Sequence, residues 1–269
     1  MSEWVNDKAR MTAIASGKGG VGKTNVAVNL AVALARGGAR TLLVDCDMGV
    51  ANAGILLGLN PSLTIADLLA RHCELDDLMI EGPSGVTLVP GHSGIGIGSA
   101  LSEPERRRLI AALAEQAGAF DHIIVDTGGG IGAENMALVA EADRALIVLA
   151  PEPTAFMDAY ALVKALSVGQ GVRAFTVVTN MVESDQAGRA LFDHFESVIT
   201  RFMEVTLAHL GSIPDDPYVR EAVRRKRCCV ELFPSARASK AFGRLAERVA
   251  VASPVRRVAA PMEACDGAG

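Results

Sequence analysis

Short apolar runs and longer amphipathic stretches alternate along the chain from end to end. The apolar runs are rich in valine, isoleucine and leucine, which predicts short buried strands. The predicted strands are Met11–Ala15, Thr41–Val44, Val86–Val89, Ile123–Val125, Ala145–Leu149, Phe175–Val178 and Leu207–Ile213. Between them apolar residues recur at helical spacing, and the predicted helices are Val26–Arg36, Glu103–Gln116, Ala133–Glu141, Ala155–Ser167, Gln186–Phe202, Tyr218–Arg225 and Ser235–Ala250. Continuous apolar strands separated by helices indicate an α/β fold with a mostly parallel sheet of about seven or eight strands and helices on both faces.

The same pattern continues without a long linker, which favours one domain over residues 1–252. The remaining residues, 253–269, contain Pro254 and Pro261 and end in small residues, so we expect a loose C-terminal tail.

Composition narrows the class of protein. Half of the 269 residues are apolar and 21% are charged, which excludes a disordered chain. The longest apolar runs, such as Ala145–Ala150, are far shorter than the roughly 20 residues of a membrane span, and Met1–Arg10 lacks the apolar core of a signal peptide. Five scattered cysteines are typical of a reduced, cytoplasmic protein.

Charge is unevenly distributed along the chain. The whole protein has a formal charge of −5, yet residues 220–257 contain eleven Lys/Arg and three acidic residues. This basic cluster is either a solvated helix surface or a docking surface for nucleic acid, anionic lipid or an acidic protein.

The strongest chemical signal is a glycine-rich loop between the first predicted strand and helix. Residues 17–24 read Gly-Lys-Gly-Gly-Val-Gly-Lys-Thr, which satisfies G-x-x-x-x-G-K-[ST] and predicts a P-loop NTPase. Glycines let backbone N–H groups point at phosphate oxygens, Lys23 places a charge on the β- and γ-phosphates, and the Thr24 hydroxyl is a ligand for Mg²⁺. The predicted nucleotide contacts in this loop are Gly17, Gly19, Gly20, Val21, Gly22, Lys23, Thr24 and Asn25.

Acidic residues follow two other predicted strands. Asp45 and Asp47 lie two residues apart after Thr41–Val44, so both can face the phosphate crevice, although such a strand end can also cap the next helix. Ile123–Val125 is followed by Asp126, the form of a Walker B strand, and Asp126 would hold Mg²⁺ directly or through water. The glycines 128–130 would let the next loop approach the γ-phosphate.

Lys18, at the second loop position, gives this loop its resemblance to a known family. The sequence Lys-Gly-Gly-Val-Gly-Lys-Thr is similar to the deviant Walker A loop of the MinD/ParA class of ATPases. The resemblance implies a Mg²⁺-dependent ATPase that forms an ATP-sandwiched homodimer, with Lys18 reaching the partner's nucleotide. It also implies that Asp47 orients or deprotonates the attacking water and that Asp45 lies near the water shell of the metal. A cation against developing phosphate charge follows the logic of an arginine finger.

The resemblance extends to base recognition. A guanine-specific signature would place a lysine at position 181, where this chain has Met181. In MinD-like proteins an asparagine contacts adenine, which corresponds to Asn180, and Ile213–Asp216 resembles a second base-contacting loop in which Pro214 and Asp215 supply the edge. We therefore expect ATP rather than GTP.

Within the MinD-like proteins, several stretches resemble the FlhG/FleN regulators of flagellar number. These stretches are Ser16–Asn25, Ala51–Asn52 with Leu56–Leu59, Asp126–Ile131 and Val230–Ser235. The resemblance implies a slow ATP-dependent dimerisation switch that binds a flagellar GTPase or transcription activator and so regulates the placement or number of flagella. It further implies a cytoplasmic protein, with a peripheral place at the inner membrane or cell pole as the alternative. Two departures are the short segment before the first strand, without the activator motif of many relatives, and the weak C-terminal helix.

Three other functions fit parts of the pattern. A ParA-type partitioning ATPase that binds DNA non-specifically agrees with the basic cluster and disagrees with the overall acidity. A cell-division MinD-type membrane ATPase would need an amphipathic C-terminal helix, but residues 235–250 have few bulky apolar residues and favour packing in the protein. An iron–sulfur scaffold of the same fold would need cysteines placed to bridge a cluster, and Cys228 and Cys229 are adjacent.

Overall fold

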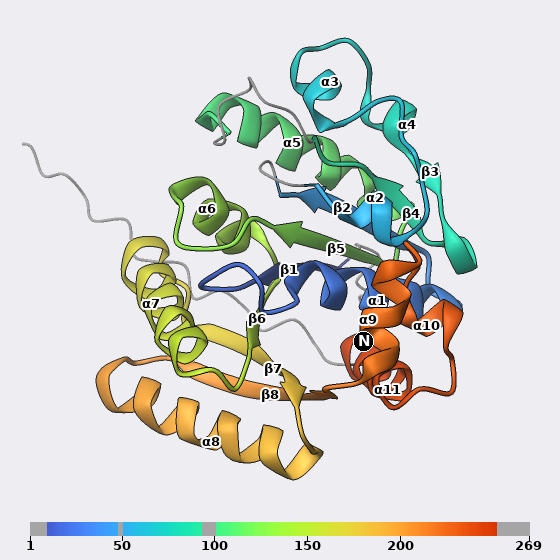
Figure 1. Cartoon of the computed structure of the whole chain (residues 1–269). Coiled ribbons are helices and arrows are strands. Elements are labelled where there is room, and N and C mark those ends of the chain that lie inside the picture. Colours follow the sequence, from blue (N-terminus) through green and yellow to red (C-terminus); the bar gives the residue numbers. More distant parts are fainter. Residues whose placement is uncertain (1–9, 48–50, 93–100, 252–269) are drawn as a thin grey trace, which may run out of the picture.

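The described part of the chain folds into an eight-stranded sheet that is covered by helices on both faces (Figure 1). The computed structural model describes residues 10–47, 51–92 and 101–251. Among these residues the strand order is β3-β4-β2-β5-β1-β6-β7-β8, and only the β3–β4 pair is antiparallel. The strands are β1 (Arg10–Ala15), β2 (Thr41–Cys46), β3 (Ile80–Glu81), β4 (Thr87–Val89), β5 (His122–Thr127), β6 (Arg144–Leu149), β7 (Ala174–Val182) and β8 (Thr206–Pro214).

The long helices agree with the predicted ones to within a few residues. They are α1 (Lys23–Arg36), α5 (Glu103–Glu115), α6 (Ala133–Glu141), α7 (Pro153–Gln170), α8 (Asp185–Phe202), α9 (Pro217–Arg224) and α11 (Arg237–Val251). The shorter elements are α2 (Ala53–Leu56), α3 (Ile65–Leu69), α4 (Leu75–Leu78), α10 (Cys229–Leu232) and the 3₁₀ turns η1 (Pro83–Gly85) and η2 (Gln116–Gly118). All seven predicted strands are present, and the predicted α/β fold with a mostly parallel sheet is confirmed.

Two apolar cores explain why the strands read as unbroken apolar runs. One core packs the sheet against α1 and α11, and the other packs it against the layer that contains α5, α6, α7 and α8. Strands β2, β5 and β6 are buried at every residue, because each lies inside the sheet with helices on both faces. The carboxyl ends of these parallel strands meet at one edge of the sheet, where ligands of open α/β folds bind.

Helix α11 buries its apolar residues inside the protein. Phe242, Leu245 and Val249 are almost fully buried and belong to the core that contains α1. The prediction that this helix packs in the protein is confirmed, and its apolar face is not available to a membrane. Within the described residues, no helix is both long and apolar enough to span a bilayer. The predicted tail 253–269 lies outside the described residues.

Candidate functional site

The glycine-rich loop connects β1 to α1, as predicted, and its glycines are required by its shape. Gly20 and Gly22 have φ angles of +87° and +86°, in the left-handed region that other residues rarely adopt. A Cβ atom on Gly22 would lie 2.4 Å from Nδ2 of Asn180, and one on Gly17 would lie 2.0 Å from the Asp158 carbonyl oxygen. The loop is therefore a tight backbone cradle, closed on two sides by β7 and α7.

A cavity of about 450 Å³ opens over this cradle. Gly19, Gly20 and residues 22–25 of the loop form its floor, and Asp47 and Asn52 line it from the chain that follows β2. Backbone N–H groups, a lysine and the N-terminus of α1 give this space the character of an anion site. The residues present fit a polyphosphate.

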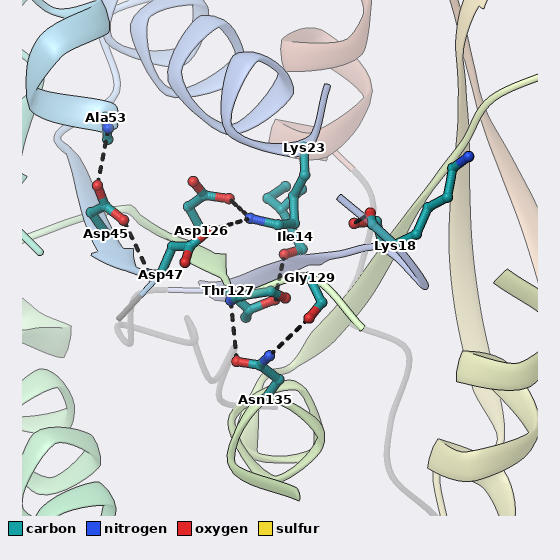
Figure 2. A network of polar contacts seen from close by, with 12 residues as sticks. Ile14, Lys18, Lys23, Asp45, Asp47, Ala53, Asp126, Thr127, Gly129 and Asn135 are labelled. Atoms are coloured by element: carbon teal, nitrogen blue, oxygen red, sulfur yellow. Dashed lines mark hydrogen bonds and ion pairs between the residues drawn. The ribbon is translucent and has the colours of Figure 1, made fainter. Parts of the chain in front are cut away.

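Beneath the cavity, Lys23 and Asp126 form a buried ion pair (Figure 2). Lys23 Nζ lies 2.6 Å from Asp126 Oδ1, and the two side chains are 7% and 0% exposed. Burial raises the pKa of the Asp126 carboxyl, and the charge of Lys23 and the Thr24 hydroxyl act against that rise. The second carboxylate oxygen, Asp126 Oδ2, is buried and has no hydrogen-bond partner among the described residues. An orphaned carboxylate oxygen beside a threonine hydroxyl fits the hard oxygen ligands of Mg²⁺.

Asp45 and Asp47 are placed differently from each other. Asp47 lines the cavity, with Oδ2 4.0 Å from Lys23 Nζ. Asp45 is buried and turns its carboxylate back onto the chain, where it accepts hydrogen bonds from the N–H groups of Asp47 at 3.2 Å and Ala53 at 3.0 Å. Burial and the neighbouring charge of Asp126 raise the pKa of Asp45 to about 7. Asp45 therefore shapes the loop and is not a wall of the cavity, so its role near a metal stays a prediction.

Lys18 points away from the Lys23–Asp126 pair in Figure 2. Its Nζ donates hydrogen bonds to Glu152 Oε2 at 2.9 Å and to Thr154 Oγ1 at 2.8 Å, at the beginning of α7. Glu152 and Thr154 were not predicted as site residues, because no local pattern reveals a contact across 134 residues. Within this chain, Lys18 is held at the rim of the cavity, away from the floor.

A further unpredicted residue, Asn135, fixes the loop after β5. Its side chain accepts a hydrogen bond from the Gly128 N–H at 3.1 Å and donates one to the Gly129 carbonyl at 3.5 Å. The Gly130 N–H in turn donates to the Ser16 carbonyl at 2.9 Å. The loop that was expected to approach the γ-phosphate therefore lies directly beside the phosphate cradle.

A second cavity of about 370 Å³ adjoins the first and shares Gly22 and Asn25 with it. The predicted base residues Asn180, Pro214 and Asp215 all line it. The Asn180 amide also donates to the Val21 carbonyl at 2.8 Å, which ties the end of β7 to the cradle. A mostly apolar slot with a few polar groups beside a polyphosphate site fits a planar base.

Met181 also lines this second cavity and was not predicted as a site residue. It has a φ of 58°, unusual for a residue with a side chain, at an irregularity in the β7–β8 pairing. Its side chain is 42% exposed. A backbone held in this conformation points to a functional constraint at the base cavity.

The cysteines do not form a metal centre among the described residues. Cys228 and Cys229 are buried free thiols, and burial raises the pKa of Cys228 to about 11. Across residues 10–47, 51–92 and 101–251, no group of three or more His, Cys, Asp and Glu side chains could hold a metal ion.

Comparisons with known proteins agree with this geometry. A ParA family model, described as NUBPL iron-transfer P-loop NTPase, matches residues 8–250. The antiactivator FleN of Pseudomonas aeruginosa is 44% identical over 240 residues, which cover 89% of this chain and 86% of FleN. The flagellum site-determining protein YlxH of Helicobacter pylori is 31% identical over 88% of this chain and 80% of its own. Among solved structures, the septum site-determining protein MinD of Pyrococcus horikoshii complexed with Mg-ADP has a TM-score of 0.72 and 28% identity over 90% of this chain and 96% of its own.

Proposed function

The chain belongs to the ParA family of P-loop NTPases, and from that premise we propose that it is a Mg²⁺-dependent ATPase that dimerises on ATP and regulates the placement or number of flagella. The observation that carries the proposal is the cavity over the glycine cradle, with Lys23 and Asp126 paired beneath it and Lys18 at its rim.

Different groups of the site bind the phosphates and the metal ion. Backbone N–H groups of residues 19–24 and the Lys23 ammonium bind the phosphates, and Lys23 exchanges its bond to Asp126 for phosphate oxygens. Thr24 and Asp126 would hold Mg²⁺, which supplies neutralisation of the charge that develops on the transferred phosphate. Asp126 then regains a positive partner for its buried charge.

Asp47 is the group we propose to position the attacking water. It is the carboxylate that lines the cavity, and with a proton acceptor there the water loses its proton as it attacks the terminal phosphorus. The bond between the β-oxygen and the γ-phosphorus breaks, and the products are ADP and phosphate.

Dimerisation gives Lys18 its proposed role. The lysine leaves Glu152 and Thr154 and reaches the nucleotide of a second copy, where its charge lies against the phosphates. The γ-phosphate is then the contact that differs between the two states, so hydrolysis shifts the population back to monomers.

The flagellar part of the proposal rests on the relatives. FleN is named an antiactivator and YlxH a flagellum site-determining protein, which together support a flagellar transcription activator as the partner. A flagellar GTPase, implied by the resemblance to the FlhG/FleN regulators, is the other candidate. We place the protein in the cytoplasm, recruited to the cell pole or inner membrane through such partners.

The variant Asp47→Ala tests the switch. With the water no longer positioned, ATP stays intact, and light scattering after size exclusion shows the mass rising from 28.0 kDa to twice that value with Mg-ATP but not with Mg-ADP. The control Lys18→Ala binds ATP and stays monomeric. A mass for Asp47→Ala that does not respond to ATP contradicts the switch, and the proteins that the trapped dimer captures identify its partner.

A further inference from the structure

A third cavity, separate from the two nucleotide cavities, lies at the β8 edge of the sheet. It has a volume of about 280 Å³ and is lined by side chains of α8, β8 and α11. Both helices pack against β8, and Figure 1 shows this strand at the end of the sheet. We call this space the edge pocket. Its polar side chains are Asp185, Arg189, His209, Ser212, Arg244 and Arg248.

An irregularity in β8 makes room for the edge pocket. His209 pairs with Val177 and Gly211 with Val178, so Leu210 is an extra residue, and its carbonyl accepts a hydrogen bond from Arg248 Nη1 at 2.5 Å. Gly211 has a φ of +147°, and a Cβ atom there would lie 3.1 Å from the same Nη1. The glycine therefore permits the Arg248 guanidinium to lie against the edge strand.

The charges that converge on the edge pocket do not cancel. Three arginines and one carboxylate, Asp185, belong to the lining, and Asp185 lies 3.8 Å from Arg244 and is 75% exposed. Arg189 also pairs with Asp193 at 2.7 Å, outside the lining. With a neutral histidine the lining carries a net charge of about +2. Burial lowers the pKa of His209, and the charges of Arg189 and Arg248 lower it further, against the opposing effects of the Gly211 backbone and of Asp193.

The floor of the edge pocket is a buried hydroxyl. Ser212 is 7% exposed, and its Oγ accepts a hydrogen bond from Thr179 Oγ1 at 2.9 Å. Its own proton is left to donate toward the pocket. His209 stacks on Phe192 with ring centroids 4.8 Å apart, which fixes the imidazole beside this hydroxyl.

Most other arginines of the basic cluster are engaged close by. Arg220 pairs with Asp215, Arg225 with Glu221 and Arg227 with Glu231. Arg244 and Arg248 converge with Arg189, from another helix, on one enclosed space, although Arg189 also pairs with Asp193 and Arg244 lies 3.8 Å from Asp185. The basic cluster is visible in the sequence, but only the fold shows that two of its arginines, Arg244 and Arg248 of α11, lie at the edge pocket.

We propose that the edge pocket binds a phosphate monoester, carried by a small metabolite or by a lipid headgroup. Guanidinium groups bind phosphate oxygens with two parallel hydrogen bonds, and a dianion matches the net charge of the lining. The pocket is large enough for the phosphate and a few further heavy atoms. The edge pocket shares no lining residue with the cavity over the glycine cradle, so its ligand binds without touching the cradle.

Calorimetry with inorganic phosphate tests the proposal, on the full chain saturated with Mg-ADP so that the phosphate cradle is filled. Phosphate binds the wild-type chain saturably, and the double variant Arg189→Gln/Arg244→Gln weakens binding by about tenfold or more, because it removes two charge-assisted donors. The matched control is Arg201→Gln/Lys240→Gln, which removes the same charge from exposed positions of α8 and α11 outside the pocket and leaves binding unchanged.

Two further arms distinguish the source of the phosphate. Binding of glycerol 3-phosphate supports a metabolite, while co-sedimentation with phosphatidylcholine vesicles only when they contain phosphatidic acid supports a lipid, and each is lost in the double variant. Absence of a saturable signal with phosphate overturns the proposal, as does equal affinity in the wild-type chain and the double variant. Binding of duplex DNA without binding of phosphate overturns it as well, because the arginines would then belong to an open nucleic-acid surface.

Discussion

At the scale of single residues, Met181 shows how a side chain can matter through its backbone. The left-handed conformation of a residue with a Cβ costs about 1–2 kcal/mol, and the fold accepts that cost at the mouth of the base cavity. Packing does not repay it, because 42% of the residue is exposed. We therefore predict that Met181 contributes to nucleotide binding through the base cavity that it lines.

Replacing Met181 by glycine separates the cost of its backbone conformation from the contribution of its side chain to ATP binding. Met181→Gly relieves the backbone and raises the free energy of unfolding by about 1 kcal/mol, whereas the loss of the thioether surface weakens ATP binding by about three- to tenfold. Chemical denaturation and nucleotide titration measure the two quantities. Met181→Ala is the control, since it loses the same surface and keeps the strain. Unchanged ATP affinity in both variants would remove Met181 from the base site.

How far the sequence predicts the site also differs from residue to residue. The glycines and Lys23 were predicted because a phosphate loop demands those residue types at fixed spacing. Asp47 and Asp126 were predicted because each follows an apolar strand, and the resemblance to the MinD/ParA class gave Asp47 its role. Glu152 and Asn135 were not found, because an ordinary acidic residue and an ordinary amide gain their roles only when α7 and α6 fold beside the loops. Asp45 was predicted as a site residue because it is an acid that follows a strand. The direction of its carboxylate could not be predicted, because it depends on the backbone N–H groups of Asp47 and Ala53.

At the scale of elements, burial on both faces made the strands easy to predict. β5 and β6 read as apolar runs because they lie inside the sheet. Their predicted starts were one residue late because His122 and Arg144 are polar, and the predicted end of β5 was two residues early because Asp126 and Thr127 are polar. β3, with two residues, and α2, α3, α4 and α10, with four or five, were not predicted. Elements this short show no periodicity, and tertiary packing stabilises them.

Helix α11 supplies the element-scale prediction. Phe242 is 1% exposed in the core shared with α1, so Phe242→Ala lowers the free energy of unfolding by about 3–5 kcal/mol, measured by urea denaturation. Val251, at the end of the same helix and 83% exposed, gives the control, and Val251→Ala changes stability by less than about 0.5 kcal/mol. Equal, small effects would mean that the apolar face of α11 is not held in the core and remains available to a membrane.

At the scale of the whole molecule, the parallel sheet brings distant segments to one edge. The loops after β1 and β2 supply the cradle and Asp47, and the end of β5 supplies Asp126. The ends of β7 and β8 supply the base cavity. Each loop alone is a weak site. Where these loops meet, a site for anions adjoins an apolar slot, and together the two match the phosphates and the base of a nucleotide.

A calorimetric titration of the wild-type chain with ATP and Mg²⁺ tests this claim most directly. The account predicts saturable binding of one ATP per chain, no competition by GTP at similar concentration, and loss of the signal in Gly22→Ala, whose Cβ would lie 2.4 Å from the Asn180 amide nitrogen. No heat of binding with ATP, or equal affinity for GTP, would contradict it.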